Sequence, residues 1–92
     1  YSSASGKALA GSVLSALNAS LGIKQPRQIK ANKDYFILKK STSPSVIVEC
    51  GFLSNPDETL LLSDKTYQKK LAQAIYIGIT DYLNQAYPKY LQ

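Results

Sequence analysis

The 92-residue sequence contains no histidine and a single cysteine, Cys50. Without histidine, the chain cannot by itself form a Ser-His-Asp triad, a Cys-His pair or a His-ligated zinc site. A lone cysteine cannot form an internal disulfide bond, so no disulfide framework is expected. No apolar run approaches the length of about 18 residues that suggests a transmembrane helix. The length and these absences indicate a small domain, or part of a larger one, that has no His-based site of its own.

The composition is that of a folded protein with a modest positive charge. Hydrophobic residues make up 45% of the chain and charged residues 18%, which is too apolar for an intrinsically disordered protein. Eleven lysine and arginine residues against six acidic residues give a net charge of +5, which suits an anionic partner without naming one. The aromatic residues are dispersed and there is no nucleic-acid-binding motif, so we expect no nucleic-acid partner.

The first part of the sequence predicts an amphipathic helix over about residues 5–21, because apolar side chains recur there with helical spacing. Ser3 or Ser5 can cap its N-terminus. The apolar stripe comprises Leu9, Val13, Ala16, Leu17 and Leu21.

The last part of the sequence predicts two further helices. Asn55 can cap a short helix over 56–62, and Pro56 suits its first turn. The Ser-Asp pair at 63–64 offers a second cap, for a long helix over 64–84. The apolar stripe of this long helix comprises Tyr67, Leu71, Ala74, Ile75, Gly78, Ile79 and Tyr82.

Between these helices lie a basic segment and two predicted strands. The basic loop and strand span 23–40, with Tyr35–Leu38 as the strand. Residues 45–49 include three successive β-branched residues, which is typical of a strand buried on both faces in an α/β sheet. Such a strand needs neighbours that this chain barely supplies. Since the sequence also begins abruptly at Tyr1, we expect one part of a larger α/β domain.

Glu49 stands at the carboxyl end of the predicted central strand, where ligands bind in open α/β sheets. A carboxyl group buried there would have a raised pKa, as a general acid/base requires. The alternative is a glutamate that reaches solvent or caps a neighbouring helix, and the position alone favours neither. Cys50 follows it, and without a histidine to activate the thiol we interpret Cys50 as a small buried core residue.

A resemblance to a known family favours the catalytic interpretation. Residues 48–56 read Val-Glu-Cys-Gly-Phe-Leu-Ser-Asn-Pro, which resembles the signature of the type 3 family of zinc-dependent N-acetylmuramoyl-L-alanine amidases. The run from Tyr35 through Val48 and the apolar positions of 71–79 also resemble this family. The similarity covers nearly the whole chain, to about Leu83.

The resemblance implies a fold and an activity. The fold would be a mixed six-stranded sheet flanked by helices, with residues 1–92 as the C-terminal half of the catalytic domain. The family cleaves the amide between N-acetylmuramic acid and L-alanine in peptidoglycan. Its zinc is held by two histidines and one glutamate in the first half, so no metal ligand is expected in this chain. Glu49 matches the general acid/base.

These implications define the expected partners and location. The chain would need the missing N-terminal half, would be inactive alone, and would act outside the cell, at the wall or on the periplasmic side of the membrane. The alternatives are a peptidoglycan-binding module without activity and, less compatible with the signature, an unrelated basic interaction domain. The basic loop is either a solvated surface or a site that attracts anionic wall polymers or stem-peptide carboxylates. We interpret Tyr67, Tyr76 and Tyr82 as partly buried helix residues.

Overall fold

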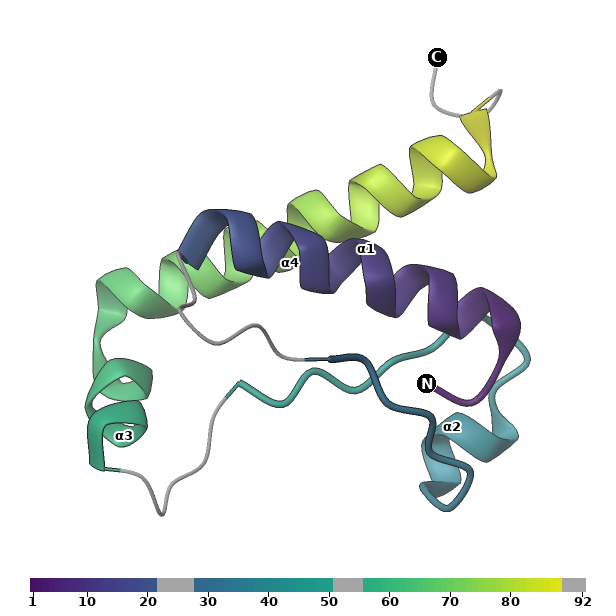
Figure 1. Ribbon diagram of the computed structural model, residues 1–92, viewed down its shortest axis with the longest axis horizontal. Coiled ribbons are helices and arrows are strands. Elements are labelled where there is room, and N and C mark those ends of the chain that lie inside the picture. Colours follow the sequence, from purple (N-terminus) through teal and green to yellow (C-terminus); the bar gives the residue numbers. More distant parts are fainter. Residues whose placement is uncertain (22–27, 51–55, 89–92) are drawn as a thin grey trace.

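The computed structural model describes residues 1–21, 28–50 and 56–88, and the regular structure within these ranges is helical (Figure 1). The helices are α1 (Ala4–Leu21), α2 (Phe36–Lys40), α3 (Pro56–Ser63) and α4 (Lys65–Ala86). The two long helices, α1 and α4, pack against each other, and α3 also contacts α4. No helix in the described ranges is both long and apolar enough to cross a lipid bilayer.

Two side chains cap the long helices at their N-termini. The Ser3 hydroxyl accepts a hydrogen bond from the Gly6 backbone N–H at 3.0 Å. The Asp64 carboxylate accepts hydrogen bonds from the Thr66 and Tyr67 backbone N–H groups at 2.7 and 3.2 Å. Each cap satisfies donors that have no partner within the helix, so the starts of both helices follow from the local sequence.

The core lies where α1 and α4 pack together. Its buried cluster consists of Val13, Leu17, Leu71 and Ala74. Gly78 allows the two backbones to approach closely, because a Cβ atom at this position would lie 2.5 Å from the Val13 Cα atom. At the same crossing, the Ser12 hydroxyl donates a hydrogen bond to the Gly78 carbonyl oxygen at 2.7 Å. The predicted apolar stripes therefore face one another.

The predicted α/β fold is wrong for the described residues, which contain no strand and no part of a six-stranded sheet. The segment predicted as the strand 35–38 instead enters helix α2. The Asn32 side chain accepts hydrogen bonds from the Asp34 and Tyr35 backbone N–H groups, forming a turn before α2. The Tyr35 carbonyl then accepts from the backbone N–H groups of Leu38 and Lys39 at 3.1 and 3.0 Å. Local hydrogen bonds therefore replace those of a strand ladder.

The second predicted strand, 45–49, is extended but is not part of a sheet. Among the described residues, no backbone hydrogen bond joins it to another segment, and a strand requires such a partner. Its predicted burial on both faces is also wrong, because Val46 and Val48 are half-buried while Ile47 is 44% exposed. Val48 packs against the core cluster, so the segment is anchored to the helices by one face.

The molecule is less compact than a typical domain of its size. Its radius of gyration is 14.1 Å, against about 12 Å expected for a compact domain of this length. Large apolar side chains are exposed on several elements, including Phe36 at 74%, Leu60 at 71% and Tyr76 at 70%. Much apolar surface therefore remains available for contact with other polypeptide or with a ligand.

Candidate functional site

A hollow of about 1020 Å³ lies between α1, α4 and the extended segments that run beneath α1. Its apolar wall includes Val13 and Leu17 from α1, Val48 from the extended segment and Leu71 from α4. Its polar lining includes Lys30, Glu49, Cys50, Glu58, Tyr67 and Lys70. The hollow thus combines an apolar wall with charged groups of both signs, as ligand sites commonly do.

Glu49 lines this hollow and is not buried there, although one of its two interpretations required burial. Its side chain is exposed, because the segment 45–49 is not covered on both faces as a central strand would be. The exposed carboxylate is accessible to a ligand in the hollow. The exposure of the carboxylate concerns its burial, and the catalytic role of Glu49 stays a prediction.

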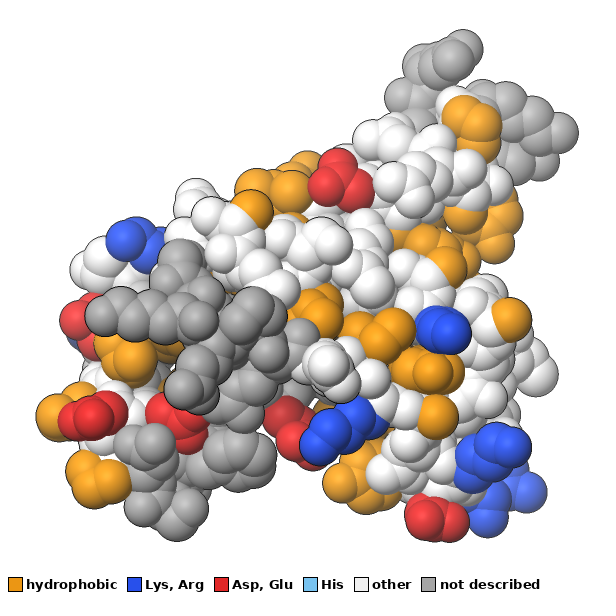
Figure 2. All heavy atoms as spheres, viewed as in Figure 1, with side chains coloured by type: hydrophobic (Ala, Val, Ile, Leu, Met, Phe, Trp, Pro, Cys, Tyr) orange, Lys and Arg blue, Asp and Glu red, His pale blue; other side chains and the backbone are white. Residues whose placement is uncertain are grey.

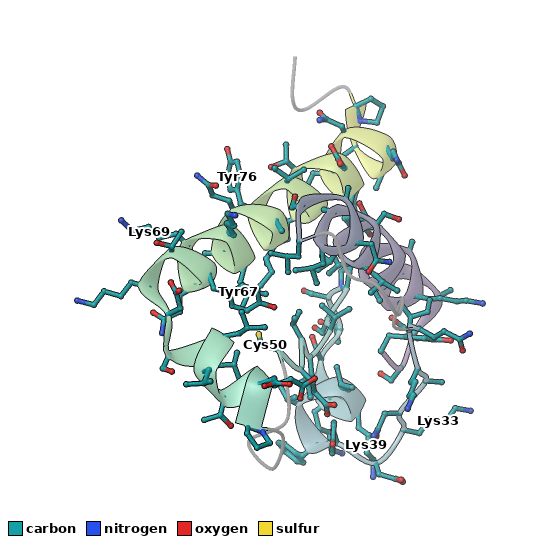
Figure 3. The ribbon with its side chains drawn as sticks, turned by 60° about the vertical axis from the view of Figure 1, so that its left-hand side comes forward. Lys33, Lys39, Cys50, Tyr67, Lys69 and Tyr76 are labelled. Carbon is teal, nitrogen blue, oxygen red and sulfur yellow. The ribbon has the colours of Figure 1, made fainter. Side chains whose placement is uncertain are left out.

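Cys50 also departs from its predicted role as a small buried core residue. It is a free, exposed cysteine, and its Sγ atom contacts the Val48 carbonyl oxygen at 3.9 Å. The reason is the same as for Glu49, since no strand among the described residues lies beside this end of the segment. Figure 3 shows Tyr67 directed from α4 toward the region of Cys50, whereas Lys69 and Tyr76 point away from the molecule.

Tyr67 and Lys70 are site residues that the sequence did not reveal. Tyr67 was interpreted as a partly buried helix residue; it is half-buried and packs against the core, and it also lines the hollow. Lys70 lies one turn further along α4 and lines the same hollow. Their spacing in the sequence places them on one helix face, but only the packing of α4 brings that face to the hollow that Glu49 also lines.

The other two tyrosines of α4 differ from each other. Tyr82 is only 7% exposed, whereas Tyr76 is 70% exposed, so the predicted partial burial of Tyr76 is wrong. Burial raises the pKa of the Tyr82 phenol above its ordinary value of 10.0, and the charge of Tyr87 and a hydrogen bond with its side chain raise it further. Tyr82 therefore belongs to the helix packing and not to the site.

The signature at 48–56 lies partly within the described residues. Residues 51–55, including the predicted cap Asn55, lie outside the described residues. Within the signature, the structure thus places Val48, Glu49 and Cys50, which line the hollow, and Pro56, which begins α3.

The residues of this chain do not fit a zinc site. The sequence has no histidine, and the described residues hold no group of three or more cysteine, aspartate or glutamate side chains that could bind a metal ion. Catalytic zinc is normally held by three protein ligands. Any zinc that acts with Glu49 would therefore need ligands from other residues.

Comparison with known proteins agrees with the signature. Residues 1–81 match the family described as N-acetylmuramoyl-L-alanine amidase. The chain belongs to this family. No solved structure matches the chain, so the family assignment rests on the sequence.

Curated relatives of the chain are longer amidases. The germination-specific N-acetylmuramoyl-L-alanine amidase of Bacillus subtilis is 39% identical over 59 residues, which are 64% of this chain and 25% of that protein. The N-acetylmuramoyl-L-alanine amidase LytC of the same organism is 35% identical over 82 residues, or 89% of this chain and 16% of that protein. The N-acetylmuramoyl-L-alanine amidase AmiA of Salmonella typhimurium is 40% identical over 50 residues, which are 54% of this chain and 17% of that protein. The chain therefore matches only a quarter or less of the length of each of these relatives.

Proposed function

We propose that this chain forms part of the catalytic domain of a peptidoglycan hydrolase that cleaves the amide between N-acetylmuramic acid and L-alanine. The observation that carries this proposal is the position of Glu49: it belongs to the signature at 48–56 and lines the hollow beside the two long helices. The family match over residues 1–81 supports the same activity.

Glu49 acts in this proposal as the general acid/base. Its carboxylate takes a proton from the attacking water as the oxygen bonds to the amide carbonyl carbon. The resulting carboxylic acid then donates that proton to the amide nitrogen as the C–N bond breaks, which restores the carboxylate. The exposed side chain of Glu49 at the hollow is compatible with this role, because it is accessible to both water and substrate.

The rest of the catalytic centre comes from other residues in this proposal. Zinc would supply Lewis-acid polarisation of the reacting groups, and its ligands would lie in the other half of the domain. The packing is unusually open, since the radius of gyration is 14.1 Å and Phe36 and Leu60 are exposed. This supports the proposal that other polypeptide covers the chain in the complete enzyme. We accordingly expect the isolated chain to be inactive, and the complete enzyme to act at the cell wall, outside the cell or on the periplasmic side of the membrane.

A chimera tests this proposal. This chain would replace the matching 82 residues of LytC, and release of stem peptides from purified peptidoglycan would be compared for the chimera, intact LytC and the isolated chain. The proposal predicts cleavage by the chimera and by LytC but not by the isolated chain. Zinc content and circular dichroism would verify that the chimera is folded.

Two results would contradict the proposal. A folded, zinc-loaded chimera that binds peptidoglycan without cleaving it would favour a non-catalytic binding module. Cleavage by the isolated chain would refute the need for the other half of the domain.

A further inference from the structure

The charge of the described residues is distributed unevenly. Residues 28–43 carry four lysines and one acidic residue, Asp34. The other described residues carry four lysines and five acidic residues. Figure 2 shows lysine side chains gathered at the end of the molecule that carries α2, and most acidic side chains elsewhere. The excess positive charge is therefore local to one end.

The lysines at this end form a basic patch, which consists of Lys30, Lys33, Lys39 and Lys40. All four side chains are exposed, and none has a hydrogen bond or ion pair within the described residues. Figure 3 shows Lys33 and Lys39 at the end of the molecule remote from Lys69. Their ammonium groups are thus free to bind an external anion.

Helix stability accounts for only part of this patch. Lys39 and Lys40 lie in the last turn of α2, where positive charge favours the helix dipole. Lys30 and Lys33 lie outside every described helix, so this explanation does not apply to them. Four like charges in a short stretch repel one another, and a bound polyanion relieves that repulsion.

The residue type indicates the kind of anion. Lysine is a compact point charge on a flexible stem, whereas arginine presents a planar fork suited to bidentate binding of a single carboxylate or phosphate group. The described lysines of the patch therefore favour a flexible polymer of closely spaced charges over one anionic group in fixed geometry. We propose that the basic patch binds the phosphate groups of an anionic wall polymer and so holds the enzyme on its substrate, an inference that rests on the proposed function.

A membrane surface is the less favoured partner for this patch. Phe36 and Ile37 are 74% and 65% exposed beside the lysines, which resembles the mixture of apolar and basic groups that binds lipid. However, α2 has only five residues and its Leu38 is buried in the protein. It therefore lacks the long apolar stripe by which amphipathic helices lie in a bilayer.

Two matched double variants of the full chain test the proposal. Lys33→Gln and Lys39→Gln remove charge from the patch. Lys65→Gln and Lys69→Gln, at exposed positions that do not line the hollow, remove the same charge from α4. Lys30 is left intact because it lines the hollow with Glu49. Binding would be measured by co-sedimentation with walls that contain phosphate polymers, with the same walls after the phosphate polymers are removed, and with vesicles of anionic phospholipid.

The proposal predicts a specific set of results. The patch variant should bind phosphate-containing walls about tenfold or more weakly, whereas the α4 variant should bind almost like the unchanged chain. Removal of the phosphate polymers should abolish the difference, and raising the salt concentration should weaken binding of the unchanged chain. Inorganic polyphosphate should compete with walls for the unchanged chain more strongly than polyglutamate, which tests the inference even if a variant fails to fold.

Other outcomes would overturn it. Equal losses in both variants would show an effect of net charge alone. Undiminished binding to walls without phosphate would indicate carboxylates or glycan, and preferential binding to vesicles would indicate a membrane. Because these readouts measure binding and not cleavage, they stand apart from the test of the amidase activity.

Discussion

Gly78 of α4 faces the backbone of α1 so closely that a Cβ atom on it would lie 2.5 Å from the Val13 Cα atom and 3.0 Å from the Val13 nitrogen. The opposing atoms are backbone, so they cannot move aside as a flexible side chain would. The contact fixes how α1 and α4 cross, and this crossing brings the Val13 side chain and the first turns of α4 to one hollow.

Gly78→Ala is therefore expected to destabilise the fold. The added methyl group must push the two helices apart, and overpacking of this kind lowers the free energy of unfolding by about 1–3 kcal/mol. Urea denaturation followed by circular dichroism measures the change. Gly11→Ala is the matched control, since a Cβ atom at Gly11 meets nothing within 4 Å and alanine favours a helix by about 0.5–1 kcal/mol. Equal effects in both variants would contradict the close packing at Gly78.

The cap of α4 gives a second prediction. Asp64→Ala leaves the Thr66 and Tyr67 backbone N–H groups without their acceptor and should lower the free energy of unfolding by about 1 kcal/mol. Asp81→Ala, an exposed acidic residue further along the same helix, should change it by less than about 0.5 kcal/mol. Thermal and urea denaturation of the two variants would show the difference. An Asp64→Ala variant with an unchanged free energy of unfolding would argue against the cap.

The raised pKa of Tyr82 predicts a loss of stability in alkaline solution. As the pH rises past 10.0, the unfolded chain releases the phenolic proton before the folded chain does, so the unfolded state is favoured. The stability that Tyr82 contributes through its raised pKa is complete below this pH. It is lost as the pH rises through the pKa of Tyr82 in the folded state. Tyr82→Phe should make the melting temperature less dependent on pH between about pH 9 and 11. Tyr76→Phe changes an exposed tyrosine, so its melting temperature should depend on pH as that of the unchanged chain does. If the melting temperatures of the unchanged chain and both variants changed equally with pH, the prediction would be contradicted.

Local signals in the sequence predicted the helical part of the fold well. These signals act within one or two helical turns, so they can be recognised from the sequence alone. They are the periodicity of Leu9, Val13 and Leu17 and the capping side chains of Ser3 and Asp64. The predicted helices over 5–21, 56–62 and 64–84 correspond to α1, α3 and α4. For α1 and α4, the apolar stripe also indicated which faces would meet.

The strands were predicted wrongly because a strand depends on distant partners. The β-branched run at 46–48 favours an extended backbone, but only a neighbouring strand can turn it into a sheet. The burial predicted for Cys50, and the buried alternative for Glu49, depended on that sheet, and both residues are exposed in its absence from the described residues. The sequence could not predict either that Tyr67 and Lys70 line the same hollow as Glu49, since this arises from the packing of α4 beside the extended segment.

The catalytic role of Glu49 is the central claim, and the rate of amide cleavage by a Glu49→Gln variant tests it most directly. The substitution would be made in the active LytC chimera, with zinc content measured in parallel. Asp81→Asn provides a control that changes an exposed acidic residue of α4 away from the hollow. Because general acid/base catalysis contributes about 10²–10⁴-fold, we expect kcat to fall by this factor in Glu49→Gln, with zinc retained, and to stay unchanged in Asp81→Asn. A Glu49→Gln enzyme that retains zinc and full kcat would contradict the account.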